Sequence, residues 1–181
     1  MLSQLGVEAL PIRLPQELRQ IDGLIIPGGE STTVAKLLAD YHLMEPIRER
    51  ARDGLPILGT CAGMILLARS VLNTPLEPLG VMDIEVRRNA FGRQADSFET
   101  DLSIPALGEE PFPGVFIRAP LLEKADHNVE ILCHLSEGGK VAAREGRLLA
   151  CAFHPELTSD LRFHRYFLDI VSDAAAKSNC R

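Results

Sequence analysis

The sequence predicts an α/β protein with an open, mostly parallel sheet, helices on both faces and a short antiparallel insertion. Two features of its 181 residues support this prediction. In the first half, short apolar runs that end at glycine alternate with segments of helical periodicity, which places parallel strands between covering helices. After Gly80, short apolar runs follow one another with Gly/Pro turns between them, which favours antiparallel pairing.

Glycine and proline mark the boundaries of the elements in the first half. In chain order we expect a short extended segment at residues 7–14, a strand at 21–26, a helix capped by Ser31 or Thr32, a helix at 45–53, a strand at 55–59 and an apolar helix of about eight residues from Met64. The first strand stops at Pro27-Gly28-Gly29 and the second ends at Gly59, as expected for runs that stop at a tight loop.

The second half contains further short strands and one long helix. The expected strands lie at residues 81–86, 98–102, 114–118, 129–134, 140–144 and 148–153, and the helix at 159–176. The apolar residues of that helix recur at helical spacing. There are no repeats or low-complexity linkers, so we expect residues 1–181 to form a single domain.

Composition excludes several classes of function. Hydrophobic residues make up 46% of the chain and charged residues 24%, which argues against disorder. The net charge of −6 and the scattered Lys and Arg argue against a nucleic-acid-binding surface. No apolar run approaches the roughly 20 residues that span a bilayer, and no basic region precedes an apolar stretch at the N-terminus, so we expect a cytoplasmic protein.

The cysteines and most of the histidines carry no motif. The four cysteines, Cys61, Cys133, Cys151 and Cys180, show no CxxC spacing, so the sequence predicts neither a disulfide scaffold nor a metal site, and it indicates no cofactor. We interpret Cys151 as a core residue. Four histidines lack an acidic or thiol partner at a meaningful spacing: His42, His127, His134 and His164.

The strongest local signal is Gly-Thr-Cys-Ala-Gly at residues 59–63, between a buried strand and a helix. A sharp strand-to-helix turn holds a nucleophile in strained backbone, and flanking glycines remove side chains that would collide. Such a turn lifts the sulfur of Cys61 clear of the sheet, and the helix N-terminus favours its thiolate. Most free cysteines are structural and buried, so this pentapeptide alone leaves both interpretations open.

A histidine and a glutamate follow the last predicted strand, in Phe-His-Pro-Glu-Leu at residues 153–157. Residues two apart in extended backbone project to the same side, so His154 and Glu156 share a face. This arrangement suits a base and the carboxylate that orients it. Alone, the pair is better explained as a capping glutamate beside a surface histidine, but a cysteine on a nucleophile turn reverses that preference.

A third segment, Pro-Gly-Gly-Glu-Ser at residues 27–31, also follows a strand. Adjacent glycines let backbone N–H groups approach a ligand closely, as an oxyanion hole requires. Any tight turn uses Gly-Gly, so the segment is weak evidence alone. Because the carboxyl ends of parallel strands meet at one edge of the sheet, we expect this loop, Cys61 and His154 to meet there.

With these segments in hand, the chain resembles the class I (triad) glutamine amidotransferases, which have a flavodoxin-like fold, and within them the glutaminase subunits of pyridoxal 5'-phosphate synthase. The strings that carry the resemblance are GLIIPGGESTT at residues 23–33, GTCAG at 59–63, RRNAFGRQADSFE at 87–99, GVFIRAP at 114–120 and AFHPELTSD at 152–160. GxCxG and HPE are shared by the whole superfamily, and the other strings single out this branch.

The resemblance implies hydrolysis of L-glutamine to L-glutamate and ammonia. By it, Cys61 attacks the side-chain carboxamide, His154 shuttles protons and Glu156 completes the triad. The backbone N–H groups of Gly29 and Ala62 would stabilise the oxyanion of the tetrahedral intermediate.

The resemblance also implies a substrate site. Its residues would be Gly29, Glu30, Ser31, Arg88, Ile117 and Arg118. An arginine is a natural partner for the α-carboxylate of an amino acid. Without the resemblance, Arg88 and Arg118 would be interpreted as residues of surface salt bridges.

A partner follows from the same resemblance, because free ammonia is lost to protonation and diffusion in water. The implied partner is a PdxS-type synthase subunit, with a (β/α)8 barrel fold, in a hetero-oligomeric complex. We expect little glutaminase activity without it, and we expect partner binding to reset the loop at Gly28 and Gly29.

The start of the chain departs from the family, whose members begin with an extra strand and a Leu-Gln-Gly loop. The N-terminal strand is therefore expected to be missing, with residues 1–5 forming the latter part of the helix after it. Burial of each large apolar side chain contributes about 1.5–3 kcal/mol, so a chain that starts at Met1 is expected to fold poorly or expose a sheet edge. A mis-assigned start codon is the preferred explanation.

Three alternatives to this function stay open from the sequence. A glutaminase that feeds histidine or purine synthesis would share GxCxG and HPE. A cysteine peptidase of the same broad fold is disfavoured, because its histidine usually adjoins the cysteine on the turn. A catalytically impaired regulatory or structural subunit is favoured by the missing N-terminus and disfavoured by the intact Cys61, His154 and Glu156.

Overall fold

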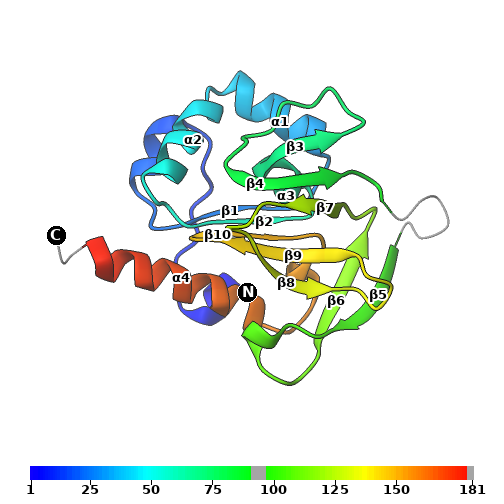
Figure 1. The fold of residues 1–181 in the computed structure, drawn as a ribbon. Coiled ribbons are helices and arrows are strands. Elements are labelled where there is room, and N and C mark those ends of the chain that lie inside the picture. Colours follow the sequence, from blue (N-terminus) through cyan, green and yellow to red (C-terminus); the bar gives the residue numbers. More distant parts are fainter. Residues whose placement is uncertain (91–96, 179–181) are drawn as a thin grey trace.

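The computed structural model describes residues 1–90 and 97–178, and within them it confirms the α/β class, with helices on both faces of a curled sheet (Figure 1). Residues 91–96 of the string RRNAFGRQADSFE and Cys180 lie outside the described residues. In the described part, the large sheet has eight strands in the order β1-β2-β10-β9-β7-β4-β3, with β8 paired to β9. A separate two-stranded sheet is formed by β5 and β6.

The strands are short and closely spaced along the chain. Their bounds are β1 Leu24–Ile26, β2 Ile57–Thr60, β3 Ala68–Leu72, β4 Met82–Arg87, β5 Ser97–Leu102, β6 Phe112–Ile117, β7 Leu121–Ala125, β8 Glu130–His134, β9 Lys140–Glu145 and β10 Leu148–Cys151. The α-helices are α1 Ser31–Asp40, α2 Met44–Arg52, α3 Ala62–Leu67 and α4 Arg162–Ser178, and the 3-10 helices are η1 Leu2–Leu5, η2 Pro15–Arg19, η3 Pro105–Leu107 and η4 Pro155–Leu157. Figure 1 shows α4 on the opposite side of the sheet from α1 and α2.

Three neighbouring strands, β1, β2 and β10, are parallel and bring their carboxyl ends to one edge of the sheet. Ile26 pairs with Gly59, and Cys151 pairs with Thr60. All residues of β2 and β10 are buried, as expected for strands covered on both faces. Beyond β10 the pairing changes, since β10–β9, β9–β7 and β7–β4 are antiparallel. The loops after the three parallel strands are the segments in which the sequence places its candidate site.

Two strands differ from the sequence prediction. The predicted apolar helix from Met64 begins at Ala62 and ends at Leu67, and the chain continues as β3, which pairs in parallel with β4. Strand β7 was not predicted, because its sequence, Leu-Leu-Glu-Lys-Ala, contains good helix formers. It forms a strand because it pairs with β4 and β9 on its two sides. In both places tertiary pairing overrides local preference.

The N-terminal region also differs in detail. Residues 2–5 form a 3-10 turn where the end of a helix was expected. The predicted cap of α1 was Ser31 or Thr32, but the N-cap is Glu30, whose carboxylate accepts hydrogen bonds from the Thr32 and Thr33 N–H groups. Glutamate caps here because its longer side chain folds back over the first turn.

Aromatic packing attaches the two-stranded sheet to the rest of the core. The Phe98 and Phe116 rings stack at 4.6 Å across β5 and β6, and Phe116 meets the Phe153 ring edge-on at 5.8 Å. Phe153 also packs at 5.2 Å against Phe163 of α4. Because Phe153 lies two residues beyond β10 and directly before His154, this contact sets β6 beside the end of β10.

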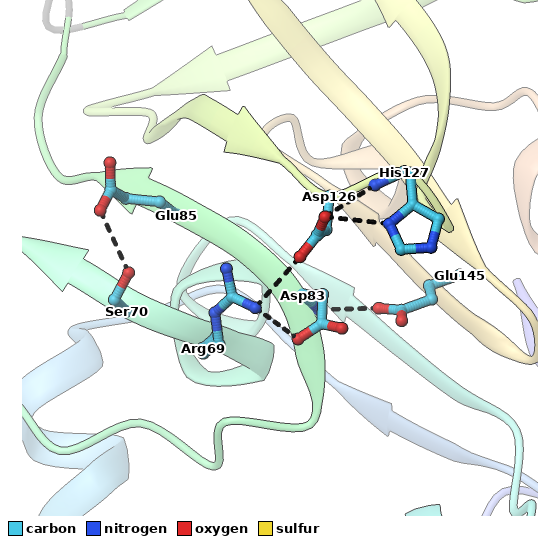
Figure 2. Close-up of polar contacts among 7 residues, drawn as sticks. All are labelled: Arg69, Ser70, Asp83, Glu85, Asp126, His127 and Glu145. Atoms are coloured by element: carbon cyan, nitrogen blue, oxygen red, sulfur yellow. Dashed lines mark hydrogen bonds and ion pairs between the residues drawn. The ribbon is translucent and has the colours of Figure 1, made fainter.

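Polar contacts between surface side chains link strands at the β3–β4 end of the sheet (Figure 2). We call it the Arg69 cluster; its members are Arg69, Ser70, Asp83, Glu85, Asp126, His127 and Glu145. The Arg69 guanidinium lies 3.0 Å from Asp83 and 3.4 Å from Asp126. Glu145 accepts the Asp83 N–H at 2.7 Å. The cluster therefore links β3, β4, β9 and the turn after β7.

None of the helices in residues 1–90 and 97–178 combines the length and apolarity that crossing a bilayer requires.

Candidate active site

Cys61 occupies the turn between β2 and α3 in a conformation that few residues adopt. Its backbone has φ 49° and ψ −102°, and a positive φ at a residue with a side chain stores strain of about 1–3 kcal/mol. The Cys61 N–H donates to Cys151 O at 2.8 Å, which ties the turn to β10. The side chain is 6% exposed, and its sulfur lies 3.9 Å from Ile117 O at the end of β6. The strained turn predicted from GxCxG is present.

The two glycines around Cys61 allow backbones to approach more closely than side chains permit. A Cβ on Gly63 would lie 2.0 Å from Ile26 O, and a Cβ on Gly59 would lie 2.6 Å from the Gly63 backbone. Both separations are far below van der Waals contact. The first turn of α3 therefore packs directly on the ends of β1 and β2, and this packing places Cys61 at the sheet edge.

His154 and Glu156 lie just beyond β10 and are joined by a hydrogen bond. The His154 Nδ1 is 2.8 Å from Glu156 Oε1, and the two side chains are 12% and 35% exposed. The His154 N–H donates to Val115 O of β6 at 2.8 Å, which anchors this segment to the neighbouring sheet. When Nδ1–H donates to the carboxylate, Nε2 is left as the acceptor of the neutral imidazole. That tautomer is the one that can receive a proton from a thiol.

Charges at these residues reinforce one another. The hydrogen bond with Cys61 is the leading cause that raises the pKa of His154 to about 9, Glu156 acts in the same sense, and burial opposes both. Burial also raises the pKa of Glu156, but the hydrogen bond from His154 and its charge outweigh burial and leave that pKa below its usual value. The arrangement therefore favours the charged imidazolium form of His154 beside the Glu156 carboxylate.

The other buried thiols have a different environment. Burial raises the pKa of Cys133 to about 11 and raises the pKa of Cys151 well above its ordinary value. Cys151 is fully buried in β10, as expected for a core residue. Both thiols donate to backbone carbonyls, Cys133 to His134 O and Cys151 to Phe153 O. Cys61 is the thiol that lies beside an imidazole.

The loop after β1 closes over the imidazole of His154. The Gly28 N–H donates to Thr60 Oγ1 at 3.1 Å. A Cβ on Gly28 would lie 2.3 Å from the Cε1 atom of His154, so a side chain here would displace the ring. Gly29 has φ 151°, a conformation that favours glycine. Sequence reasoning placed Gly28 in this loop but missed its close approach to His154 and its hydrogen bond to Thr60, because such long-range contacts leave no pattern in the chain.

Glu30, Ser31 and Arg88 form the outer part of the candidate site. The Arg88 guanidinium lies 3.0 Å from Glu30 Oε1. Hydrogen bonds from the Thr32 hydroxyl, then from the Thr33 backbone and hydroxyl, lower the pKa of Glu30 to about 2. The Ser31 hydroxyl is buried and has no hydrogen-bond partner among the described residues. The Glu30 carboxylate, the Arg88 guanidinium and the unpaired Ser31 hydroxyl therefore lie beside the loop at Gly29.

Ile117 and Arg118 are placed differently from each other. The Ile117 carbonyl faces the Cys61 sulfur. Arg118 follows with φ 43° and an exposed side chain, for which the described residues provide no ion pair or hydrogen bond. Ile117 and His154 therefore both contact Cys61, whereas the Arg118 side chain lies on the exposed surface.

Two further features of the molecule bear on ligands. In the described part of the chain, no three His, Cys, Asp or Glu side chains are grouped so as to hold a metal ion. A hollow of about 520 Å³ lies elsewhere, between α1 and α2; its lining residues are Ala35, Ala39, His42, Met44, Glu45 and Glu77.

Comparisons with known proteins agree on one family. Residues 1–173 match the SNO glutamine amidotransferase family. The chain is 59% identical over 173 residues to the pyridoxal 5'-phosphate synthase subunit PdxT of Herpetosiphon aurantiacus, which covers 94% of this chain and 91% of that protein. The protein of the same name from Carboxydothermus hydrogenoformans is 58% identical over 170 residues, 94% of this chain and 88% of that one.

Solved structures extend the comparison to the fold. A crystal structure of a glutamine amidotransferase superposes with a TM-score of 0.89 at 45% identity, covering 94% of this chain and 90% of that one. A protein of Thermoplasma acidophilum that is named as part of a GMP synthase superposes with a TM-score of 0.69 at 17% identity, covering 98% and 88%. The second likeness shows the fold alone.

Proposed function

The chain belongs to the SNO glutamine amidotransferase family, and from this premise we propose that it hydrolyses L-glutamine to L-glutamate and ammonia as the glutaminase subunit of pyridoxal 5'-phosphate synthase. The observation that carries the proposal is the contact of Cys61 with His154, whose other ring nitrogen lies 2.8 Å from Glu156. Identity of 58–59% to two proteins named as subunits of that synthase supports the assignment of the pathway.

In the proposed reaction, His154 accepts or donates one proton at each step, and it returns the last one to the Cys61 sulfur. The thiol gives its proton to His154 Nε2, and the thiolate attacks the carboxamide carbon of glutamine. His154 then protonates the leaving nitrogen, and ammonia departs from a thioester. A water molecule gives its proton to His154 as it attacks the thioester, and glutamate leaves with the thiol restored. Glu156 holds the imidazole in the required tautomer and supports its positive charge.

The oxyanion of the tetrahedral intermediate needs hydrogen-bond donors, and we assign these to the backbone. Ala62 is the first residue of α3, so its N–H has no acceptor four residues earlier within the helix. Gly29 follows the loop that packs on His154 and supplies the second N–H group. One donor of this kind contributes about 2.7–4 kcal/mol to transition-state stabilisation.

The Glu30–Arg88 ion pair supports the proposal that the substrate is an amino acid. A free α-amino acid carries one ammonium and one carboxylate, and the pair offers one charge of the opposite sign to each. Ser31, with its unpaired hydroxyl, adds a hydrogen-bond donor and acceptor. Gly29, Ile117 and Arg118 complete the proposed substrate site.

We assign the partner and location by the same premise. The ammonia would be received by a PdxS-type synthase subunit within a hetero-oligomeric complex, and the protein would be cytoplasmic. Docking of that subunit would set the Gly28–Gly29 loop for catalysis.

The test is glutamate release from L-glutamine, measured with and without the synthase subunit. We expect release to depend on Cys61 and to increase when the synthase is added. Cys133→Ala is the matched control, since it removes a buried thiol outside the site. Equal rates with and without the synthase would contradict the gating, and release that survives Cys61→Ala would contradict the enzyme.

A glutamine-like diazo-ketone separates the enzyme from an impaired scaffold. Labelling of Cys61 in the presence of the synthase is the expected result. A chain that binds the synthase but is not labelled at Cys61 would be a regulatory or structural subunit.

A further inference from the structure

Thr60, the last residue of β2, carries a hydroxyl in a strand that is otherwise apolar. The residues before it in β2 are Ile57, Leu58 and Gly59, and Thr60 itself is 1% exposed. Valine is branched at Cβ in the same way and suits a buried strand equally well. A buried hydroxyl also needs a hydrogen-bond partner to offset the loss of water. Packing alone is therefore a poor explanation for a threonine at this position.

The partner of this hydroxyl lies in the loop after β1. Thr60 Oγ1 accepts the Gly28 N–H at 3.1 Å, across 32 residues of chain. The backbone pairing of β1 with β2 ends one step earlier, where Ile26 pairs with Gly59. Because branching at Cβ restricts the rotamers of Thr60, the strand fixes the direction of its hydroxyl. The side chain of Thr60 therefore extends the connection between β1 and β2 into the loop, beyond the last backbone pair.

Thr60 is connected to the loops after β1, β2 and β10, which together form the candidate site. Cys61 follows Thr60 directly in the chain. The backbone of Thr60 pairs with the last residue of β10, three residues before His154. Its hydroxyl holds Gly28, and Gly28 lies against the His154 ring, where an added Cβ would be 2.3 Å from Cε1. A displacement of Gly28 would therefore change both the contact with His154 and the position of the next residue, Gly29.

We propose that Thr60 is a positioning residue that holds the Gly28–Gly29 loop in place for catalysis, an inference that rests on the proposed glutaminase function. Two adjacent glycines make a loop with much conformational freedom, and Gly29 already has φ 151°. The proposed function assigns one oxyanion donor to the Gly29 N–H, so the distance from this group to the Cys61 sulfur affects the rate. A misplacement of about 1 Å in such a group can cost about 10²-fold. The hydrogen bond at Gly28 restricts the loop on the side that faces His154.

The experiment compares three variants: Thr60→Val, Thr60→Ser and Ile57→Val. Valine removes the acceptor and keeps the branched shape, whereas serine keeps the acceptor and removes a methyl group. Ile57→Val is the matched control, because it shortens a fully buried residue of the same strand and leaves the Thr60 hydroxyl in place. The first measurement is the hydrogen-exchange rate of the Gly28 amide, obtained by NMR of the free chain. The second is kcat and KM of glutamate release with the synthase subunit.

We expect Thr60→Val to speed exchange of the Gly28 amide by about tenfold, as the loss of one hydrogen bond predicts. It should also reduce kcat by on the order of tenfold with little change in KM, because the oxyanion forms only after glutamine has bound. Thr60→Ser should recover most of both losses, and Ile57→Val should change neither. Unchanged Gly28 exchange in Thr60→Val, no recovery in Thr60→Ser, or an equal loss of kcat in Ile57→Val would overturn the proposal. If the wild-type chain with its synthase released no glutamate, the proposed function would fail, while the exchange measurement would still decide whether Thr60 holds the loop.

Discussion

Two histidine–carboxylate pairs with similar geometry lie in different regions of the molecule. His154 is 2.8 Å from Glu156 at the edge of the parallel strands, and His127 is 3.1 Å from Asp126 in the Arg69 cluster (Figure 2). The side chains of His154 and Glu156 are 12% and 35% exposed. Those of His127 and Asp126 are 83% and 45% exposed. The hydrogen bonds are alike, so burial and neighbours must account for any difference in chemistry.

The neighbours differ more than the pairs do. His154 lies beside the Cys61 thiol and under the Gly28 backbone, where solvent screens charges poorly. Asp126 faces the Arg69 guanidinium in a setting open to water, where ion pairs contribute little. A hydrogen-bonded histidine and carboxylate therefore become a candidate catalytic pair only when a nucleophile and burial accompany them.

Removing the thiol gives the largest expected change. Cys61→Ala should reduce glutamate release by roughly 10⁴-fold or more, because the covalent step is lost. The same variant should lower the pKa of His154 from about 9 toward its ordinary 6.5, since the hydrogen bond with Cys61 is the leading cause of the increase. Imidazole NMR measures this shift. If the pKa of His154 stayed at about 9 in this variant, the thiol would not be what sets the His154–Glu156 pair apart from the His127–Asp126 pair.

Exchanging the two histidines for alanine tests the comparison directly. His154→Ala should reduce kcat by about 10²–10⁴-fold, the contribution of a general base. His127→Ala should leave kcat unchanged, since its partner Asp126 lies on the surface of the antiparallel region. Both are measured as glutamate release with the synthase subunit. Similar losses in the two variants would mean that the exposed pair also takes part.

A methyl group at position 28 should disturb the buried pair by colliding with the His154 ring, while every functional group of the pair is still present. Gly28→Ala places a Cβ 2.3 Å from the His154 ring, so we expect the ring to shift and kcat to fall by roughly 10²-fold. Gly138→Ala is the control, because it introduces backbone strain at φ 93° with nothing within 4 Å. It should lower stability by about 1–3 kcal/mol and leave kcat intact.

Stability should depend on pH through His154. A pKa raised from 6.5 to about 9 means that the folded state binds the proton more tightly, so this stabilisation is complete below about pH 6.5 and is lost as pH rises through 9. At 1.36 kcal/mol per pKa unit, its upper limit is about 3 kcal/mol. Chemical unfolding of wild type and His154→Ala at pH 6 and pH 9.5 measures it. Parallel pH dependences in the two proteins would contradict the assignment.

Removing the central cation of the exposed region should have the smallest effect. Arg69→Ala breaks contacts with Asp83 and Asp126, but its side chain is 56% exposed. We expect a loss of about 0.2–1 kcal/mol of stability, smaller at high salt, and unchanged glutamate release. A loss of several kcal/mol would mean that this cluster holds the sheet together as strongly as buried contacts do.

The sequence predicted the class of fold and the three loops that meet at the sheet edge, because each loop follows a buried apolar run at the end of a strand. It did not predict β7, whose residues favour a helix until β4 and β9 pair with it. The Glu30 cap was missed because serine and threonine are the more frequent caps. The roles of the site residues stay predictions, although the structure places Cys61, His154 and Glu156 together.

Spacing alone could not rank the two histidine–carboxylate pairs. His154 and Glu156 are two residues apart, and His127 directly follows Asp126, so both have a local acidic neighbour. What separates them is long-range: the Gly28 loop, which lies more than a hundred residues earlier, and the Val115 carbonyl that accepts the His154 N–H. Contacts between residues so far apart in the sequence form only when the sheet is assembled, and no periodic pattern in the sequence predicts them.

The close approach of Gly63 to Ile26 has a mechanical consequence. Strand β1 is the last strand on its side of the described sheet, yet its final carbonyl occupies the space where a Gly63 side chain would stand. Lateral movement of this outermost strand is therefore transmitted to the first turn of α3, and from there to the sulfur of Cys61. The orientation of the Cys61 sulfur therefore depends on the position of β1, which pairs with a single strand in the described sheet.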